Sequence, residues 1–509
     1  MTDPENFPAH PGEPLPEPPP AAPPAPTSGG PTRRGVIQGA AGIAAAGMVL
    51  ARPGIVRAAS ENPVKIGFIE DESGNLSIYG IQKLHAARLA VQEINDGYTL
   101  AGGPVGSGCL GTMGLYTPTP PTLTSGPGAK LNIVNDGGTP SEHAIVTADT
   151  EEILIPSGEK GLLGRPVDLL SSDGQSNNTL WQQLARRMIQ QDKVDVLVAG
   201  FASAEREAIR PIVDQRKQLY FYTNQYEGGV ADGYTFCTGA VCEQQVIPVM
   251  QYMVEKFGPK IFTIAANYNF GQLTAAWVRS FAPVLKAKVI GEEFPPLEVS
   301  EFSSVIAKVQ AAKPDWVMTL LVGQNQSNYY PQAAAAGLHL PMASTVNMAQ
   351  GYEHKRFTPP SLANMHNAVN YMQEIPTKRN QDFVARFYKM FPNDPYLGQM
   401  AQNTYFSIHL YAKAVRLIGT TDQEKVRRTL EAGWAIEAPE GTVFLEPATH
   451  HASHYIRLAA TDEKQQISFV REWPMIEAWW LQRLGVNLVR HPEYKQYTPQ
   501  EDPFFKMFS

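Results

Sequence analysis

Hydrophobic residues along this chain follow two alternating patterns. Runs that are apolar at almost every position predict strands buried on both faces, and they occupy residues 64–69, 166–170, 194–200, 261–265 and 316–321. Stretches with apolar residues at helical spacing predict helices, and they occupy residues 79–95, 179–192, 272–284, 302–312 and 327–336. Strands of this kind that alternate with helices form mostly parallel sheets flanked by helices. Because the alternation occurs in two parts of the chain, we expect an α/β protein with two lobes and a hinge between them.

The predicted organisation after residue 59 has four segments. Residues 60–242 form a first lobe, interrupted at 98–158 by an insertion rich in Gly, Pro, Thr and Ser. Residues 243–370 form a second lobe, and residues 371–465 return to the first lobe and then to the second. Residues 466–509 form a C-terminal extension with several Trp and Phe residues, and this aromatic content predicts that the extension packs on the body.

The first 59 residues are predicted to be an export signal preceded by a disordered Pro-rich stretch. Two arginines, Arg33 and Arg34, stand ahead of a weakly apolar run that ends near Ala51, and small residues follow at Ala58 and Ala59. This order is typical of a twin-arginine signal peptide, which directs a folded protein to the periplasm. The alternative is a membrane anchor, but the run is shorter than the ~20 residues that span a bilayer. We therefore expect cleavage near Ala58 or Ala59 and no stable membrane insertion afterwards.

Net charge and cysteine content narrow the possible partners. The chain has 509 residues and a formal net charge of -7, so it has no electrostatic reason to bind nucleic acid. Its three cysteines, Cys109, Cys237 and Cys242, form no zinc-binding pattern, and we expect no metal site and no cofactor. Cys237 and Cys242 are close enough in sequence for a small disulfide, although two unlinked residues near a turn are slightly favoured.

Catalytic signatures are missing from the sequence. It contains no GxSxG, HExxH or phosphate-binding loop motif. The only adjacent histidines, His450 and His451, are predicted in a strand and would point to opposite faces. The sequence therefore predicts a protein that is not an enzyme and has no catalytic residues.

Several short motifs occur together in a characteristic order. They include Lys65-Ile66-Gly67-Phe68, Leu163-Gly164-Arg165-Pro166-Val167-Asp168-Leu169, Tyr222-Thr223-Asn224-Gln225-Tyr226-Glu227-Gly228 and Ala438-Pro439-Glu440-Gly441. In this order they resemble the type I periplasmic binding proteins, in particular the leucine/isoleucine/valine-binding and amide/urea-binding receptors of ABC importers. The resemblance covers roughly residues 64–465 apart from the insertion, and the Tyr222 to Gly228 loop is similar to the amide/urea branch.

This resemblance implies which residues contact a ligand between the lobes. The loop after the strand at 194–200 supplies Ala202 and Ser203, and Ser203 matches the ligand serine of the family. A hydroxyl there could instead serve as a helix N-cap. The complete predicted set is Ser73, Ala202, Ser203, Tyr222, Asn224, Tyr268, Phe270, Gln324 and Tyr371. Core packing is an equally good interpretation of Phe270.

The ligand class follows from charge. An α-amino acid needs a carboxylate beside its ammonium group, and Glu70, Glu227 and Glu298 are individually better explained as solvated loop charges. A short amide, urea or similar small polar solute is therefore favoured over an amino acid. The resemblance implies a periplasmic solute-binding protein that passes its ligand to the permease and ATPase subunits of an ABC importer. A periplasmic ligand sensor of the same fold is the main alternative, and a secreted hydrolase is a weaker one.

Overall fold

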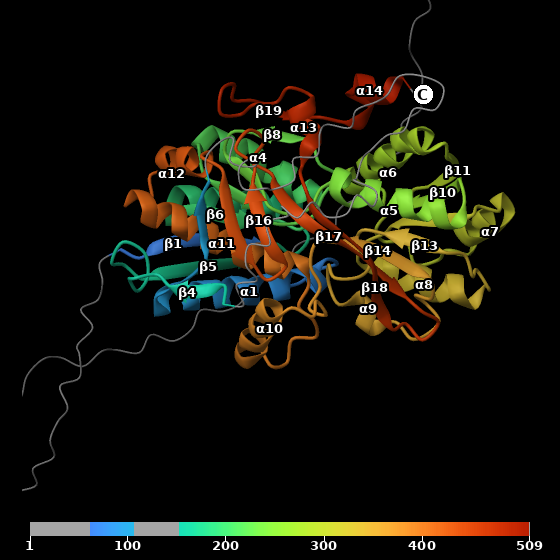
Figure 1. The fold of residues 1–509 in the computed structure, drawn as a ribbon, viewed down its shortest axis with the longest axis horizontal. Helices are drawn as coiled ribbons and strands as arrows, with labels where there is room; N and C mark the ends of the chain where they lie inside the picture. Colours follow the sequence, from blue (N-terminus) through green and yellow to red (C-terminus); the bar gives the residue numbers. More distant parts are fainter. Residues whose placement is uncertain (1–61, 106–151, 508–509) are drawn as a thin grey trace, which may run out of the picture. The chain divides into compact units, whose positions relative to one another are not determined.

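The computed structural model describes residues 62–105 and 152–507 (Figure 1). The predicted signal peptide, most of the insertion and Cys109 lie outside these residues. Among the described residues, no helix is both long enough and apolar enough to cross a membrane.

The first lobe is built on a five-stranded parallel sheet in the order β5-β1-β6-β7-β9. Its strands are β1 (Val64–Glu70), β5 (Val167–Asp173), β6 (Val196–Ala199), β7 (Tyr220–Tyr222) and β9 (Thr235–Cys237). Helices cover both faces: α1 (Ser77–Asp96) and α11 (Gln399–Ile418) on one, α3 (Asn178–Arg187) and α4 (Ser203–Arg216) on the other.

Strand β6 shows why the lobe needs helices on both sides. Val196 and Val198 pack with residues of α1 and α11. Leu197 and Ala199 pack with residues of α3 and α4. All four side chains are at most 1% exposed. The continuous apolar run therefore reflects burial of alternate residues on opposite faces.

A ten-stranded sheet with the order β11-β10-β12-β13-β14-β17-β16-β15-β3, in which β18 also pairs with β17, begins in the second lobe and ends in the first, because residues of β15 and β16 pack in the core that contains α1 and α11. The strands from β11 to β14 are parallel, and the pairings from β14 onward are antiparallel. The strands are β3 (Gly102–Pro104), β10 (Lys260–Ala265), β11 (Lys288–Glu293), β12 (Trp316–Leu320), β13 (Met342–Ser344), β14 (Met365–Val369), β15 (Trp434–Ala438), β16 (Gly441–Leu445), β17 (Ala452–Thr461) and β18 (Ile467–Ile476).

Helices and short elements complete the two lobes. The main helices beside the second sheet are α5 (Cys242–Phe257), α6 (Asn269–Phe281), α7 (Ser303–Ala312) and α8 (Gln324–Ala335). The remaining elements are β2 (Tyr98–Leu100), β4 (Leu154–Pro156), η1 (Met188–Asp192), β8 (Val230–Asp232), η2 (Ala282–Leu285), α9 (Glu353–Arg356), α10 (Lys378–Met390), α12 (Gln423–Leu430), α13 (Trp479–Arg483), β19 (Tyr494–Gln496), η3 (Pro499–Glu501) and α14 (Pro503–Lys506).

The C-terminal extension packs on the body, as its aromatic content predicts. Its first part forms β18, and later β19 pairs with β8 in an antiparallel ladder (Figure 1). The Trp480 ring lies edge-on against Trp277 of α6, with 4.6 Å between ring centroids. Phe505 contacts the same Trp277 ring at 5.5 Å. The extension therefore contacts β8 beside the first sheet and α6 beside the second.

Candidate functional site

The carboxyl ends of parallel strands in the two lobes meet around one small cavity. Ser203 follows β6, Asn224 follows β7, Tyr268 follows β10 and Val322 follows β12. It is lined by Phe201, Ser203, Asn224, Gln225, Tyr268, Phe270 and Val322, and these side chains leave about 0 Å³ of space for a water-sized sphere, so the cavity is closed in this structure. Crevices at the carboxyl ends of strands are where open α/β sheets bind ligands. Four of the nine sequence-predicted contact residues line this cavity.

Ser203 is the first residue of α4, and Ala202 occupies the N-cap position. The N-cap interpretation of Ser203 is therefore wrong by one residue. The Ser203 hydroxyl instead donates to Oε2 of Glu227, with 2.5 Å between the oxygens. Both side chains are buried. The hydroxyl proton of Ser203 is thus directed away from any ligand in the cavity.

Asn224 and Tyr222 share one backbone acceptor. The Asn224 side-chain amide donates to the carbonyl oxygen of Phe201 at 2.6 Å, and the Tyr222 hydroxyl donates to the same oxygen at 2.6 Å. A carbonyl can only accept, so this bond fixes the orientation of the Asn224 amide. The Asn224 Oδ1 atom is buried and has no hydrogen-bond partner among the described residues. It is therefore an acceptor without a donor.

Tyr268 and Phe270 provide the aromatic wall from the second lobe. Tyr268 is the N-cap residue of α6, and its ring centroid lies 6.1 Å from that of Phe270. Burial raises the pKa of Tyr268 well above its ordinary value, so its hydroxyl keeps its proton. Phe270 is 3% exposed and belongs to the hydrophobic core as well as to the cavity wall. Core packing of Phe270 is therefore confirmed, and its ligand contact stays a prediction.

The structure places the other five predicted residues outside the cavity lining. Ser73 is exposed and donates to Asp173. Gln324 is exposed at the start of α8. Tyr371 is buried against Phe383, and its hydroxyl has no hydrogen-bond partner among the described residues. Tyr222 lies behind the cavity, and the Ala202 N–H donates to Glu205.

Glu205 closes the first turn of α4. Burial raises the pKa of its carboxyl well above the ordinary value, and the negative charge of nearby Asp71 raises it further. Its Oε2 atom accepts hydrogen bonds from the backbone N–H groups of Phe201 and Ala202, at 2.9 and 2.8 Å. These donors at the start of the helix are therefore already paired.

Glu227 is the residue whose role the sequence did not reveal. It is 2% exposed, which rules out the interpretation as a solvated loop charge. Its Oε1 atom accepts from Arg206 at 2.7 Å and from Gln496 of the C-terminal extension at 2.8 Å. The Arg206 guanidinium lies over the rings of Tyr222 and Tyr226. Only its place in the Tyr222 to Gly228 motif could have drawn attention to it.

The other acidic candidates have different surroundings. Glu70 is also buried, not solvated, and it forms an ion pair with Lys83. Glu298 is exposed. No charged side chain is found among the described residues that line the cavity. The polar groups of the cavity wall are therefore neutral.

Cysteine and histidine side chains lie outside the cavity wall. Cys237 and Cys242 are buried free thiols, and burial raises the pKa of Cys237 to about 12. His450 contacts Glu431 at 3.2 Å, whereas His451 contacts Tyr226 at 2.5 Å, so the two imidazoles face different partners. Within residues 62–105 and 152–507, no cluster of three metal-ligating side chains could hold a metal ion.

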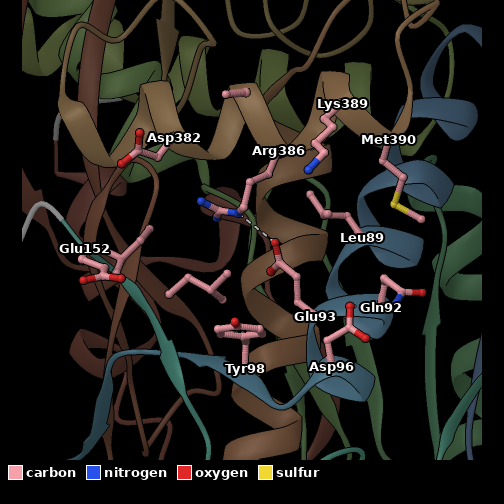
Figure 2. Close-up of a pocket in the computed structure, with 13 residues that line it drawn as sticks. Leu89, Gln92, Glu93, Asp96, Tyr98, Glu152, Asp382, Arg386, Lys389 and Met390 are labelled. Carbon is pink, nitrogen blue, oxygen red and sulfur yellow. Dashed lines mark hydrogen bonds and ion pairs between the residues drawn. The ribbon is translucent and has the colours of Figure 1, made fainter.

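A larger hollow of about 810 Å³ lies between α1, α10, β2 and β4 (Figure 2). Its carboxylate Glu93 accepts from Arg386 at 2.9 Å (Figure 2). Glu93 also accepts from the Tyr405 hydroxyl at 2.6 Å. Its rim includes Tyr98 and Met390, which are 42% and 40% exposed. This groove is built from helices and short edge strands and does not lie at the ends of parallel strands. Its carboxylate is already paired, so it is a weaker candidate for a solute site.

A model of the periplasmic binding protein family matches residues 63–466. The chain belongs to this family. Solved structures of periplasmic binding proteins share its two-lobed fold. A solute-binding protein of an ABC transporter from Rhodopseudomonas palustris BisB5, in complex with 3,4-dihydroxybenzoic acid, is 18% identical with a TM-score of 0.62, covering 82% of this chain and 99% of that one.

Two solved structures of amino-acid ABC transporter binding proteins are similar to a comparable degree. An amino acid ABC transporter substrate-binding protein from Pseudomonas fluorescens Pf-5 is 15% identical with a TM-score of 0.61, covering 82% of this chain and 97% of that one. A branched chain amino acid ABC transporter periplasmic ligand-binding protein from Burkholderia xenovorans LB400 is 18% identical with a TM-score of 0.58, covering 81% and 96%. At these identities the likeness shows the periplasmic binding protein fold and leaves the ligand to be argued from the site.

Proposed function

We propose that this protein is the periplasmic solute-binding component of an ABC importer, and that it captures a short amide, urea or amino-acid-like solute between its lobes. Family membership supports the transport role, since the similar structures are described as ABC transporter binding proteins. The observation that carries the proposal is the small cavity where Ser203 and Asn224 of one lobe face Tyr268 and Phe270 of the other. Closure around the solute presents the closed form to the permease and ATPase subunits.

The direction of the hydrogen bonds favours an amide or urea within this range. The Ser203 hydroxyl proton is given to Glu227 and one N–H of Asn224 is given to Phe201, which leaves the Ser203 oxygen and Asn224 Oδ1 as acceptors for a ligand. A ligand group that carries N–H donors satisfies them, whereas a carboxylate would face two acceptors. A lone ammonium group would find no charged partner in the cavity wall. A neutral amide or urea group meets both conditions.

The location is proposed from the sequence. Arg33 and Arg34 support export by the twin-arginine route, which places the folded protein in the periplasm beside the permease.

Thermal unfolding of the full-length chain with added solutes tests this function. The panel comprises urea, acetamide, benzamide, benzoate and leucine, and a ligand at one hundred times its dissociation constant should add about 2.7 kcal/mol of stability. Ser203→Ala and Tyr268→Ala should abolish the shift. Ser304→Ala, which alters an exposed serine of α7 outside the cavity, is the matched control. If no compound shifts unfolding while a chromogenic substrate panel is turned over, the binding function is wrong.

A further inference from the structure

The carboxylate of Glu227 links the ligand serine to two other parts of the molecule. Its Oε2 atom accepts from the Ser203 hydroxyl. Its Oε1 atom accepts from Arg206 and from Gln496. Two donors on one oxygen fix the orientation of the carboxylate plane, and this orientation directs the other oxygen at Ser203.

The charge of Glu227 is balanced within the same cluster. Arg206 is fully buried and lies 2.7 Å from Oε1 of Glu227. A guanidinium can only donate, so the bond from Arg206 makes Oε1 of Glu227 an acceptor and compensates the buried carboxylate. The Ser203 hydroxyl therefore has a strong acceptor on the side away from the cavity, and its lone pairs are left for the ligand.

Gln496 reaches Glu227 because the C-terminal extension is held by backbone pairing. In the β19 and β8 ladder, Gln496 lies opposite Val230. The N–H of Tyr497 donates to the carbonyl oxygen of Gly229 at 2.8 Å. These bonds hold the Gln496 backbone next to the Glu227 to Gly229 turn, and its side chain donates to Oε1 of Glu227.

The second lobe contacts the same turn. Trp277 of α6 donates its indole N–H to the carbonyl oxygen of Glu227 at 2.9 Å. Helix α6 also carries Phe270 of the cavity wall, and Trp480 of the extension packs on Trp277. The family match ends at residue 466, so Gln496 and Trp480 belong to a part of the chain outside the family pattern.

We propose that Glu227 is a positioning residue that keeps the Ser203 hydroxyl an acceptor toward the ligand, and that the C-terminal extension, through Gln496, is a working part of the ligand site. The proposal rests on the proposed binding function. It predicts that selectivity between an amide and its carboxylate isostere depends on residues that do not line the cavity.

The test compares matched ligand pairs on the full-length chain by isothermal titration calorimetry. The pairs are benzamide with benzoate and acetamide with acetate. The wild type should bind the amide of a pair at least ten times more tightly than the acid. In Glu227→Gln the new amide donates to Ser203 and frees its hydroxyl to donate, so the amide-to-acid affinity ratio should fall at least tenfold. Gln496→Leu should lower the same ratio two- to tenfold.

The controls separate positioning from general damage. Glu207→Gln removes another carboxylate that accepts from Arg206 but does not touch Ser203, so its ratio should equal that of the wild type. Lys495→Gln alters the neighbour of Gln496 in β19 and should also have no effect. If Glu227→Gln does not fold, Glu227→Asp keeps the charge near Arg206 and withdraws it from Ser203, and this variant should also lose selectivity.

The possible results test the positioning role of Glu227 separately from the proposed solute-binding function. Wild-type protein that prefers the acids, or folded Glu227 and Gln496 variants with an unchanged ratio, overturns the positioning role and leaves the binding function in place. Wild-type protein that binds leucine but no amide has the same consequence. If the wild-type protein binds no compound of the wider panel, both the positioning role and the binding function are wrong.

Discussion

The ring of Tyr79 stacks on the ring of Phe201, with centroids 3.8 Å apart and an angle of 4° between the ring planes. The hydroxyl of the same Tyr79 accepts a hydrogen bond from the backbone N–H of Gly323 at 2.8 Å. Phe201 lines the cavity, whereas Gly323 precedes α8 beside the second sheet. One side chain of α1 therefore connects the cavity wall of the first lobe to the second lobe.

We expect Tyr79→Phe to keep the stack and to leave the N–H of Gly323 without its partner. The free energy of unfolding should fall by about 1 kcal/mol, the usual value of one hydrogen bond. Denaturation should use guanidinium chloride, because urea is a candidate ligand. Tyr494→Phe is the control, since that ring is 48% exposed, and it should change nothing measurable. Equal stability of the two variants would contradict the role assigned to the Tyr79 hydroxyl.

Replacement of Trp480 tests the attachment of the extension to α6. Trp480 is fully buried against Trp277, and its indole N–H donates to Asp502 at 2.8 Å. Trp480→Ala should lower the free energy of unfolding by about 3–5 kcal/mol, the usual cost of removing a large buried ring. Trp480→Phe keeps an aromatic ring and loses the N–H, so its loss should be clearly smaller. Circular dichroism in guanidinium chloride measures both, and equal losses would mean that ring packing is not the main contribution.

Two adjacent glycines provide a matched test of the contact between β19 and β8. Gly228 and Gly229 have similar positive φ angles of 82° and 88°, so an added side chain strains the backbone equally at both positions. A Cβ at Gly229 would lie 2.1 Å from the carbonyl oxygen of Tyr497, whereas a Cβ at Gly228 has no neighbour closer than 3.7 Å. Gly229→Ala should therefore displace the extension, and Gly228→Ala should not.

Hydrogen exchange followed by mass spectrometry measures this difference. Residues 494–497 should exchange much faster in Gly229→Ala than in Gly228→Ala, because the backbone bonds between the extension and β8 are lost. The same extension protected equally in both variants would show that the Gly229 contact does not hold it.

Because of Glu446, the free energy of unfolding should fall as the pH rises above neutral. Burial, together with the nearby charge of Glu477, raises the pKa of Glu446 to about 8. A carboxyl whose pKa is higher in the folded than in the unfolded state contributes stability below the unfolded value near 4.5, and this contribution disappears as the pH rises through 8. Its partners, Ser453 and Gln482, are neutral donors, so they only partly compensate its charge.

Glu446→Gln removes this titration. Relative to the wild type, the variant should gain on the order of 4 kcal/mol of stability between pH 4.5 and pH 9, because the wild type alone must ionise a buried acid. Guanidinium denaturation at both pH values measures the change. Glu463→Gln, at an exposed position, is the control. A constant difference between Glu446→Gln and the wild type across this range would contradict the shifted pKa.

Local patterns were enough to predict most elements of the sheets. The run at 194–200 contains β6, and the predicted helix 79–95 lies within α1. The predicted helix 179–192 is α-helical only to Arg187 and continues as a π-helical turn from Met188 to Asp192. Hydrophobic periodicity identifies such a segment as helical, but it does not distinguish the i→i+5 hydrogen bonds of a π-helix from the i→i+4 bonds of an α-helix.

The site was predictable where its residues follow strands directly. Ser203, Asn224, Tyr268 and Phe270 each lie within a few positions of a strand end, and strand ends converge in this fold. Contacts between distant segments were not predictable. The side chains of Gln496 and Glu227 meet across 269 positions of sequence, and no periodic pattern records that distance.

The position of the extension in the chain also sets the order in which the protein can be completed. Synthesis proceeds from the N-terminus, so Ser203 and Glu227 are made long before Gln496 and Trp480. Until those last residues are added, Glu227 lacks one of its donors and the Trp277 ring lacks its cover. The contacts of Glu227 with Gln496 and of Trp277 with Trp480 therefore form only after residues 496 and 480, respectively, have been added. A ribosome that stops before residue 480 releases a polypeptide that contains every cavity-lining residue but cannot complete the packing behind them.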